Sequence, residues 1–466
     1  MAFTQTLGGV LRSSGGRDEV RATAAPFSAR REPLILEERL GGGVPPRRSD
    51  AGPPPSARLP PDIAFLCRNG VPERVVRLAC FLAAARGTQP TDELFANGFD
   101  RHRYWSSLAE DLGLPFARNL DGAVIARNAS ATADAVRLAS SVLVEIGGGT
   151  VLVVAPKGDE LARLRLRLAE NAALAERVRI AAPETIRAFL VARRHAALTN
   201  YAVNRLARVL PRLSARDLLS RDRVRGPMTL LAACVAMGLL APASTFTAAT
   251  VFLTLFFFNC GFWKAMAAFR RPRPLRVEPL PSRHLPVYSV LVPLHRESAV
   301  IADLIGNLAA LDYPASKLQI LFLLEADDHA SREAVARQTM PSNFEVVVVP
   351  PGEPRTKPKA LAYGLPFARG EFVVVFDAED RPEPDQLRKA AAAFRERPDL
   401  GCVQARLALD HEGSWFARMF KLEYAANFEV LLPALADAGV PLPLGGTSNH
   451  SRGRFWSASA PGTRTT

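Results

Sequence analysis

The stretch "VYSVLVPLHRE", residues 287–297, decides the fold of the C-terminal half of this chain. It begins as a run of apolar residues without polar alternation, which is typical of a strand buried on both faces, and it ends in charged residues. An amphipathic helical pattern follows in "AVIADLIGNLAALDYP", and a second apolar run, "LQILFLLEADD", again ends in acids. This order predicts a strand, a helix and a parallel strand.

The same alternation continues along the chain with "FEVVVVPP", the helical "KPKALAYGLPFA" and the strand "GEFVVVFDAED". Continuously apolar strands separated by helices indicate a mostly parallel sheet that is covered on both faces. In such α/β sheets ligands bind beyond the carboxyl ends of the strands. The functional residues are therefore expected in the loops after these strands.

Acidic residues follow three of the predicted strands, and they are Glu297, Glu325, Asp327, Asp328, Asp377, Glu379 and Asp380. Carboxylates alone form a poor cradle for an anionic ligand. A hard cation such as Mg²⁺ or Mn²⁺ would bind carboxylate oxygens on one side and diphosphate oxygens on the other. The pattern therefore predicts a metal-dependent enzyme that uses a nucleotide sugar.

Six short motifs occur in an order and at spacings that resemble glycosyltransferase family 2, which has the GT-A nucleotide-diphospho-sugar fold: "SVLVPLHRE", "LLEADD", "KPKAL", "FDAED", "VQARL" and "GGTSNH". The resemblance covers residues 285–450. It implies a membrane-bound, inverting enzyme of the bacterial polysaccharide type, which moves a sugar from a nucleotide diphosphate to a glycan or lipid acceptor.

The resemblance also implies roles for residues of this chain. Pro293 and Glu297 would line the nucleotide pocket, and a solvated surface position is the alternative for Glu297. Asp327 or Asp328 would contact the nucleoside. Lys359 would approach the phosphates or the ribose.

Asp377 and Glu379 match the Asp-x-Asp metal motif of the family, with Glu in place of the second Asp, so that either Glu379 or Asp380 would touch the metal. The donor sugar and the acceptor would lie over six residues of "GGTSNH": Gly445, Gly446, Thr447, Ser448, Asn449 and His450. His450 is equally compatible with an ordinary loop histidine.

The N-terminal half differs in composition. Residues 1–60 are rich in Gly, Pro, Ser and Arg, which predicts a disordered tail. Residues 61–220 show mixed helix and strand patterns, with two strands around a glycine turn in "SVLVEIGGGTVLVVAP". The "EDLGLPF" stretch and the small α/β unit after it resemble the N-terminal domain of type II secretion ATPases. That resemblance implies a regulatory or partner-binding module, and a folded spacer is the alternative.

Residues 226–268 include a long uncharged stretch with a break at Pro242-Ala-Ser244, which predicts two transmembrane helices folded as a hairpin. Arginine and lysine flank both sides, so the positive-inside rule places the soluble domains in the cytoplasm of a multi-pass inner-membrane protein. A hairpin buried in a protein core is the alternative. The amphipathic "SWFARMFKLEYAANFE" could pack in a core or lie on the membrane.

Bulk composition agrees with a membrane partner. Lys and Arg exceed Asp and Glu by 59 to 46, a formal net charge of +13, which favours an anionic neighbour. No nucleic-acid-binding motif is present, so an anionic lipid surface is the better candidate than nucleic acid. The five cysteines form no CxxC pair, which fits a reducing cytoplasm.

Residues 451–466 show no structural pattern. One permitted set of codons for them, read two bases along, contains the "WDPYNV" segment of the family. We therefore expect a frameshift after His450, with the general base encoded downstream and little turnover by this chain. A catalytically inactive membrane adaptor, or a regulatory nucleotide-binding protein, is the alternative.

Overall fold

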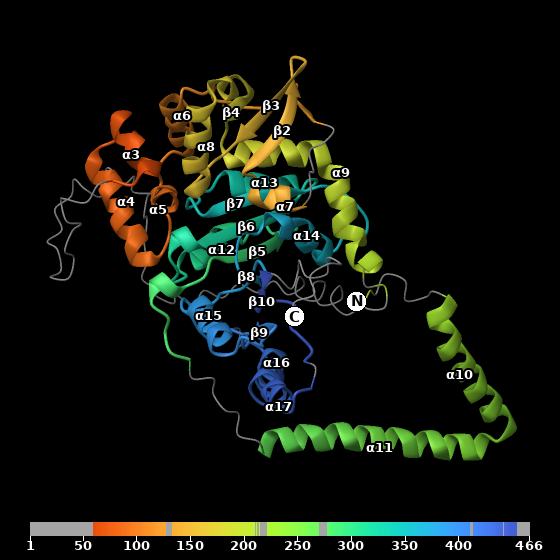
Figure 1. Ribbon diagram of the computed structural model, residues 1–466. Helices are drawn as coiled ribbons and strands as arrows, with labels where there is room; N and C mark the ends of the chain where they lie inside the picture. The colour runs from red at the N-terminus through yellow and green to blue at the C-terminus, as the bar shows by residue number, and fades with distance from the viewer. Residues whose placement is uncertain are drawn as a thin grey trace, which may run out of the picture. The chain divides into compact units, whose positions relative to one another are not determined.

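The computed structural model describes residues 59–126, 133–209, 211, 214, 221–269, 277–410, 413–440 and 442–453 (Figure 1). The expected disordered tail, residues 1–60, lies outside the described residues except for its last two. The expected aberrant tail, residues 451–466, is described only as far as residue 453.

The N-terminal module begins with four helices: α3 Pro61–Arg68, α4 Glu73–Arg86, α5 Pro90–Ala96 and α6 Arg101–Leu112. Helix α4 ends where Gly87 adopts the left-handed conformation, with a φ of 63°. The side chain of Asp100 caps α6 by accepting a hydrogen bond from the His102 N–H. The four helices share one core, in which Tyr104 and Trp105 are fully buried.

A four-stranded sheet of order β1-β2-β3-β4 completes the module, with α7 Ala133–Leu138, α8 Asp159–Glu170, the 3₁₀ helix η1 Ala172–Arg177 and the 27-residue α9 Pro183–Val209. Its strands are β1 Val124–Ile125, β2 Ser141–Ile146, β3 Gly149–Val154 and β4 Val178–Ile180. Strands β2 and β3 pair antiparallel around Gly147 and Gly148, as the sequence predicts.

Two consecutive helices follow, α10 Arg221–Leu240 and α11 Pro242–Phe269, so the break falls at Ala241. Among the described residues, only α11 is long and apolar enough to cross a membrane. The apolar part of α10, Val224–Leu240, is shorter. The predicted pair of membrane helices is thus supported for α11 alone, and a membrane hairpin is not shown.

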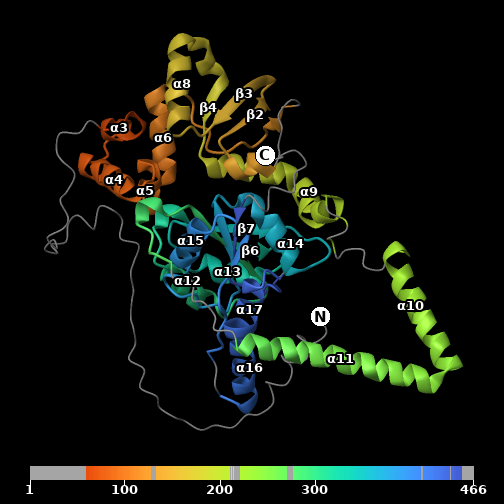
Figure 2. The same ribbon diagram turned by 60° about the horizontal axis from the view of Figure 1, so that its bottom comes forward.

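The C-terminal domain is built on a six-stranded sheet of order β7-β6-β5-β8-β10-β9 (Figures 1 and 2). Its strands are β5 Tyr288–Leu294, β6 Leu318–Glu325, β7 Phe344–Val349, β8 Phe372–Val375, β9 Cys402–Gln404 and β10 Asn449–Arg452. The first four strands are parallel, as the sequence predicts, and β10 runs antiparallel to both β8 and β9.

Alternate side chains of the parallel strands enter two separate cores. One core contains residues of α12 Ile301–Ala309, α13 His329–Ala336 and α15 Gln386–Glu396. The other contains residues of α14 Lys357–Gly364 and the 3₁₀ helix η5 Leu365–Phe367. Short 3₁₀ helices also lie at Ser282–His284 (η3) and Ala315–Lys317 (η4).

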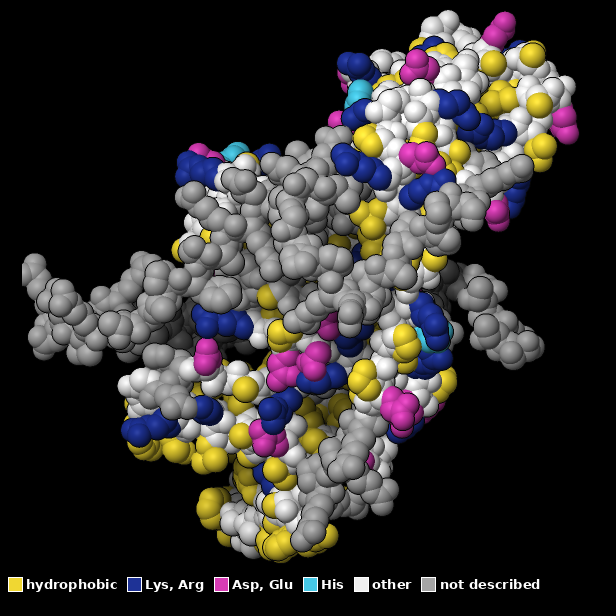
Figure 3. Space-filling model, turned by 90° about the vertical axis from the view of Figure 1, so that its left-hand side faces the viewer, with side chains coloured by type: hydrophobic (Ala, Val, Ile, Leu, Met, Phe, Trp, Pro, Cys, Tyr) yellow, Lys and Arg dark blue, Asp and Glu magenta, His cyan; other side chains and the backbone are white. Residues whose placement is uncertain are grey.

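After β9 the chain forms α16 Trp415–Ala425, the π-helix η6 Ala426–Leu431 and α17 Leu432–Asp437. Helix α16 buries none of its residues and exposes a run of large apolar side chains, namely Trp415, Phe416, Met419, Phe420 and Leu422. In the space-filling view hydrophobic side chains gather at the lower edge, the end where Figure 1 draws α11, α16 and α17 (Figure 3).

Candidate active site

The predicted site residues gather at the carboxyl ends of β5, β6 and β8 and on the segment that leads into β10. Pro293 lies within β5, in register with Leu323 of β6, and Glu297 follows in the next loop. Asp377 follows β8, and Ser448, just before β10, donates its backbone N–H to the Val375 carbonyl at 2.7 Å. The sheet topology therefore places the acidic loops and "GGTSNH" at the same edge.

Asp377 is paired with Lys357, a residue that the sequence analysis did not select. The Lys357 ammonium bonds the Asp377 carboxylate and also donates to the Gly446 carbonyl at 2.7 Å. The side chain of Lys357 is 33% exposed, so its charge lies on the surface of the site. Lys357 is the first residue of "KPKAL", at the start of a helix that follows a strand of the sheet. This position in the sequence could have identified it as a site residue.

Lys359, the lysine that the sequence analysis selected, has a different environment. Its Nζ donates to the Glu325 carboxylate at 2.9 Å and to the Pro350 carbonyl at 3.3 Å, and its side chain is only 2% exposed. Lys359 therefore ties α14 to the end of β6, and it is Lys357 that faces the open side.

The neighbouring acids Asp327 and Asp328 are also separated by their surroundings. Asp328 is buried and caps α13, accepting hydrogen bonds from the Ser331 N–H at 3.1 Å and the Arg296 N–H at 2.6 Å. Burial alone would raise the pKa of Asp328, but these hydrogen bonds outweigh burial and lower it. Asp327 is 42% exposed and forms an ion pair with Arg355 at 2.7 Å, so it is the more accessible of the two.

Glu379 and Asp380 also differ in their exposure to solvent. Asp380 accepts hydrogen bonds from the Asp377 N–H at 2.7 Å and from the Thr447 hydroxyl, and burial raises its pKa. Glu379 is exposed. Of the two alternatives for the second metal ligand, Glu379 is the one whose carboxylate is open to solvent.

Glu297 lies within the electrostatic reach of the other acids. Its pKa is raised, first by burial and then by the negative charges of Glu379, Asp377 and Asp328, although His295 opposes this. The negative charges of these carboxylates therefore act on Glu297 at the same edge of the sheet. A bound cation at this edge would relieve that repulsion.

The "GGTSNH" segment forms a closely bonded floor. Gly445 donates its N–H to the Gln404 side-chain oxygen at 2.9 Å, and the Gln404 amide donates to the Thr447 carbonyl at 3.1 Å. Ser448 has a φ of 54°, a left-handed conformation that is unusual for a residue other than glycine. Asn449 donates its amide to the Gly445 carbonyl, while its buried Oδ1 has no protein partner.

His450 lies beneath this floor, within the sheet. It is fully buried, and its two ring nitrogens contact the Tyr288 hydroxyl at 2.6 Å and the Gln386 amide nitrogen at 3.1 Å. Burial lowers the pKa of His450 to about 3, so the ring is neutral at pH 7. The structure thus places His450 in the core of the C-terminal sheet.

The donor set fits a Mg²⁺ or Mn²⁺ ion that is shared with a substrate. Among the described residues, no three His, Cys, Asp or Glu side chains form a preformed metal cage. Mg²⁺ is commonly held by one or two carboxylates together with substrate phosphates and water. Asp377 and the exposed Glu379 supply two such carboxylates at the end of β8.

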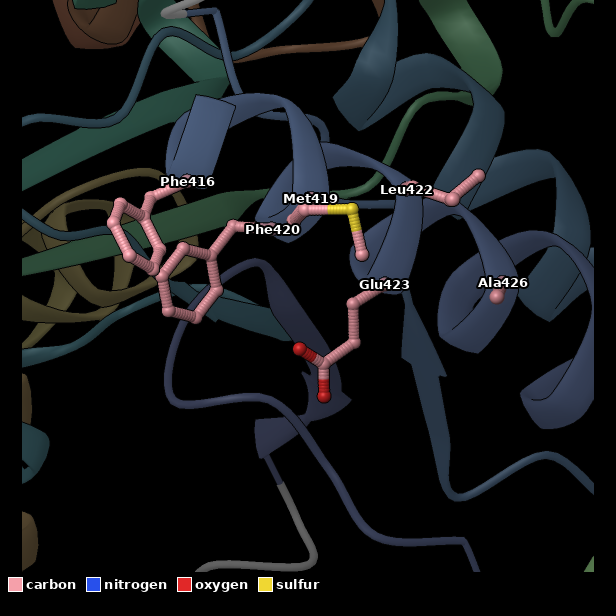
Figure 4. A pocket seen from close by; sticks show the side chains of 6 residues that line it. All are labelled: Phe416, Met419, Phe420, Leu422, Glu423 and Ala426. Atoms are coloured by element: carbon pink, nitrogen blue, oxygen red, sulfur yellow. The ribbon is translucent and has the colours of Figure 1, made fainter. Parts of the chain in front are cut away.

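A separate apolar pocket of about 400 Å³ lies on α16 and the start of η6 (Figure 4). Its lining is formed by Phe416, Met419, Phe420, Leu422, Glu423 and Ala426. The close-up labels Phe416 and Phe420 among the lining side chains, with Glu423 as the one acidic side chain of the six. Such a surface suits an apolar ligand better than a sugar.

Residues 286–458 match the model of the family described as "Glycosyltransferase like family 2". Among curated proteins, the chain is 32% identical over 145 residues to a beta-monoglucosyldiacylglycerol synthase of Trichormus variabilis, which is 30% of each chain. It is 31% identical over 158 residues to glucomannan 4-beta-mannosyltransferase 2 of Arabidopsis thaliana, 31% of this chain and 29% of that protein. The matched region thus spans less than a third of either relative.

Among solved structures, similarity extends to the mannosyltransferase PcManGT from Pyrobaculum calidifontis in complex with GDP-Man and Mn²⁺. The sequence identity is 23% and the TM-score 0.34, over 49% of this chain and 58% of that one. The matched family residues begin just before β5 and run past β10. They include every strand of the C-terminal sheet and the acidic loops at its edge. The similarity to glycosyltransferase-like family 2 therefore covers the whole C-terminal sheet, residues 286–458.

Proposed function

We propose that the C-terminal domain, a GT-A-type fold, transfers a sugar from a nucleotide diphosphate sugar to a lipid or polysaccharide acceptor with the help of Mg²⁺ or Mn²⁺. The observation that carries this proposal is the contact of Lys357 with both Asp377 and the Gly446 carbonyl, with the exposed Glu379 two residues after Asp377 in the same loop. Carboxylates for a cation and an ammonium for phosphate oxygens then lie beside one small-residue floor.

In this proposal Asp377 and Glu379 hold the cation, which neutralises the charge of the leaving diphosphate when it is bound. Lys357 donates to phosphate oxygens, exchanging its bond to Asp377 for one to the ligand. Asp327 and Glu297 face the nucleoside and ribose, since both lie on the loops at the carboxyl ends of β5 and β6. The sugar lies over Gly445 and Gly446, and the transfer is a direct, inverting displacement.

A lipid acceptor is favoured over a polysaccharide by the apolar surface of α16. Five large apolar side chains of this helix are exposed, and four of them line the pocket of Figure 4. Acyl chains can cover such a surface, whereas a glycan would leave it in water. We also propose that α11 attaches the chain to a bacterial inner membrane, with both soluble parts in the cytoplasm.

The test uses the full chain in detergent micelles and a panel of UDP- and GDP-sugars, with donor binding measured by calorimetry in the presence of Mn²⁺. We expect one donor to bind only with the cation, and Asp377→Asn to lose binding at least about tenfold, because a charge-assisted contact contributes roughly 1.5–3 kcal/mol. Asp410→Asn is the matched control, since its side chain is 89% exposed and its ion pair is with the exposed Arg381.

Sugar transfer to diacylglycerol or to a glycan acceptor is measured with the same preparations. Donor binding that is equally strong without metal, or equal in Asp377→Asn, would contradict the proposed enzyme. It would favour the alternative, a membrane adaptor or regulatory nucleotide-binding protein without catalysis.

A further inference from the structure

The two faces of the C-terminal sheet are covered by different parts of the chain. One core is composed entirely of residues from the C-terminal domain, including Leu304, Phe322 and Phe394. The core on the opposite face is continuous with the N-terminal module, because Trp105 and Leu190 belong to the same cluster of buried residues as others from β6, β7 and α14, namely Leu323, Val347 and Tyr363. The N-terminal module thus provides part of the cover of the transferase sheet.

Buried polar contacts hold this junction in place. The Ser316 hydroxyl of η4 donates to the carboxylate of Glu93 at 2.6 Å, and Glu93, on α5, is fully buried. Arg187 of α9 is 8% exposed and donates to Glu345 of β7 at 3.3 Å. Because buried charges require their partners, these contacts specify one arrangement of the two parts.

Helix α9 continues from this junction to the donor side of the domain. It packs against α14, and Leu198 of α9 and Ala360 of α14 are buried in the same core. Farther along, Thr199 lies against the loop before α14. A Cβ atom added to Gly352 would be 3.2 Å from the Thr199 Cγ2 methyl.

The position of α14 matters because this helix carries Lys357 and Lys359. Helix α14 has only eight residues, and isolated helices of that length are not stable, so its position must come from packing. The sheet packs against one side of α14, and α9 packs against it as well.

We propose that α9 is a positioning element of the donor site, which fixes α14 and the 350–356 loop and thereby the two lysines. This inference rests on the proposed function, since it assigns the N-terminal module a role in donor binding. The module is then part of the transferase rather than a spacer, and a partner that binds it could alter donor affinity through α9.

A double-mutant cycle across the Gly352–Thr199 contact tests this positioning role in the full chain. Gly352→Ala inserts a methyl group against Thr199, and the φ of Gly352 allows alanine. Thr199→Ser removes the Cγ2 methyl but keeps the hydroxyl, which bonds the His195 carbonyl within the helix. We expect Gly352→Ala to weaken donor binding about 3- to 10-fold, Thr199→Ser to have little effect, and the double variant to recover.

Hydrogen exchange of residues 350–364 provides a second measurement that does not require a donor. Exchange should accelerate in Gly352→Ala and return to the wild-type rate in the double variant. Gly306→Ala is the matched control, because a Cβ on this α12 glycine meets nothing within 4 Å.

The two measurements separate the two proposals. If no nucleotide sugar binds even the wild-type chain, the proposed function fails, while the exchange rates still test whether α9 holds α14. The positioning role would be overturned if Gly352→Ala changed neither the hydrogen-exchange rates nor the donor affinity. It would also be overturned if the loss of donor affinity in Gly352→Ala persisted in the double variant with Thr199→Ser.

Discussion

Lys357 and Lys359 are two residues apart on α14, yet their side chains have opposite surroundings. Lys359 is almost completely buried and bonded to Glu325, whereas Lys357 is one-third exposed beside Asp377. The same division separates two pairs of acids, with Asp328 and Asp380 turned inward and Asp327 and Glu379 turned outward. The site therefore has an inner layer (Lys359, Asp328, Asp380) and an outer layer (Lys357, Asp327, Glu379).

The difference shows that residues close together in the sequence can have two different roles, one in stability and one in binding. Members of the inner layer are hydrogen-bonded to backbone and neighbouring side chains, so they fix the loops at the carboxyl ends of β6 and β8. Members of the outer layer keep charge on an accessible surface, where ligand atoms can replace their present partners. Substitutions in the inner layer should reduce stability, and those in the outer layer should reduce binding.

The largest effect is expected when the buried ion pair of the inner layer is broken. Lys359→Met should destabilise the chain by about 3–5 kcal/mol, because it leaves the Glu325 carboxylate buried without its cation. Urea unfolding of the full chain in micelles measures this. Lys357→Met is the matched control and should change stability by less than about 1 kcal/mol while weakening donor binding, since its ion pair is partly exposed.

The double variant Lys359→Met/Glu325→Gln sharpens the test. Removing both charges should recover much of the lost stability, because no uncompensated charge remains. Equal destabilisation by Lys357→Met and Lys359→Met would contradict the division into two layers.

The sequence predicted where the two layers lie but not which residue belongs to each. Apolar runs identify β5, β6 and β8, and in a parallel sheet the residues that follow such strands must meet at one edge. Whether Asp327 or Asp328 turns inward depends on where α13 begins, and the structure starts it at His329, which makes Asp328 the cap. Lys357 was missed for a similar reason, because the start of α14 decides which lysine faces the sheet.

The sequence patterns also could not predict which helices pack against the sheet. The helical period of α9 cannot say that this helix packs against α14 as well as against its own module. In the same way, the amphipathic pattern of α16 allows packing in a core, yet the structure buries none of its residues, while the neighbouring α15 buries residues such as Leu387 and Phe394. Amphipathicity predicts that a face is covered, and only the tertiary arrangement shows by what.

A moderate effect is expected from removing the cap in the inner layer. Asp328→Ala should cost about 1–2 kcal/mol of stability, because α13 loses its N-cap and the Arg296 N–H loses its acceptor. Asp328→Asn should retain most of it, since asparagine is also a good N-cap. Thermal unfolding compares these with Asp327→Ala, which should stay within about 0.5 kcal/mol of wild type as an exposed position. A larger loss from Asp327→Ala than from Asp328→Ala would reverse the assignment of the two aspartates.

The smallest expected change in stability comes from the pH dependence of His450. This buried residue lies in the core below the inner layer, and burial lowers its pKa. Its folded-state pKa of about 3 lies below the usual 6.5, so below pH 6.5 protons bind the unfolded chain more readily than the folded one. The contribution of His450 is thus fully present above pH 6.5 and is lost progressively as the pH falls toward 3. Between pH 6.5 and 5.5 we expect a loss approaching about 1 kcal/mol.

Urea unfolding at a series of pH values, compared between the wild-type chain and His450→Gln, isolates this contribution. Glutamine does not titrate but can still form a hydrogen bond with Tyr288, which is bonded to His450 in the core. The variant should therefore show a shallower decline in stability between pH 6.5 and 5, whatever its stability at pH 7. Parallel declines in the two proteins would mean that His450 is protonated in the folded state, and so that the floor beneath Thr447 and Ser448 admits water.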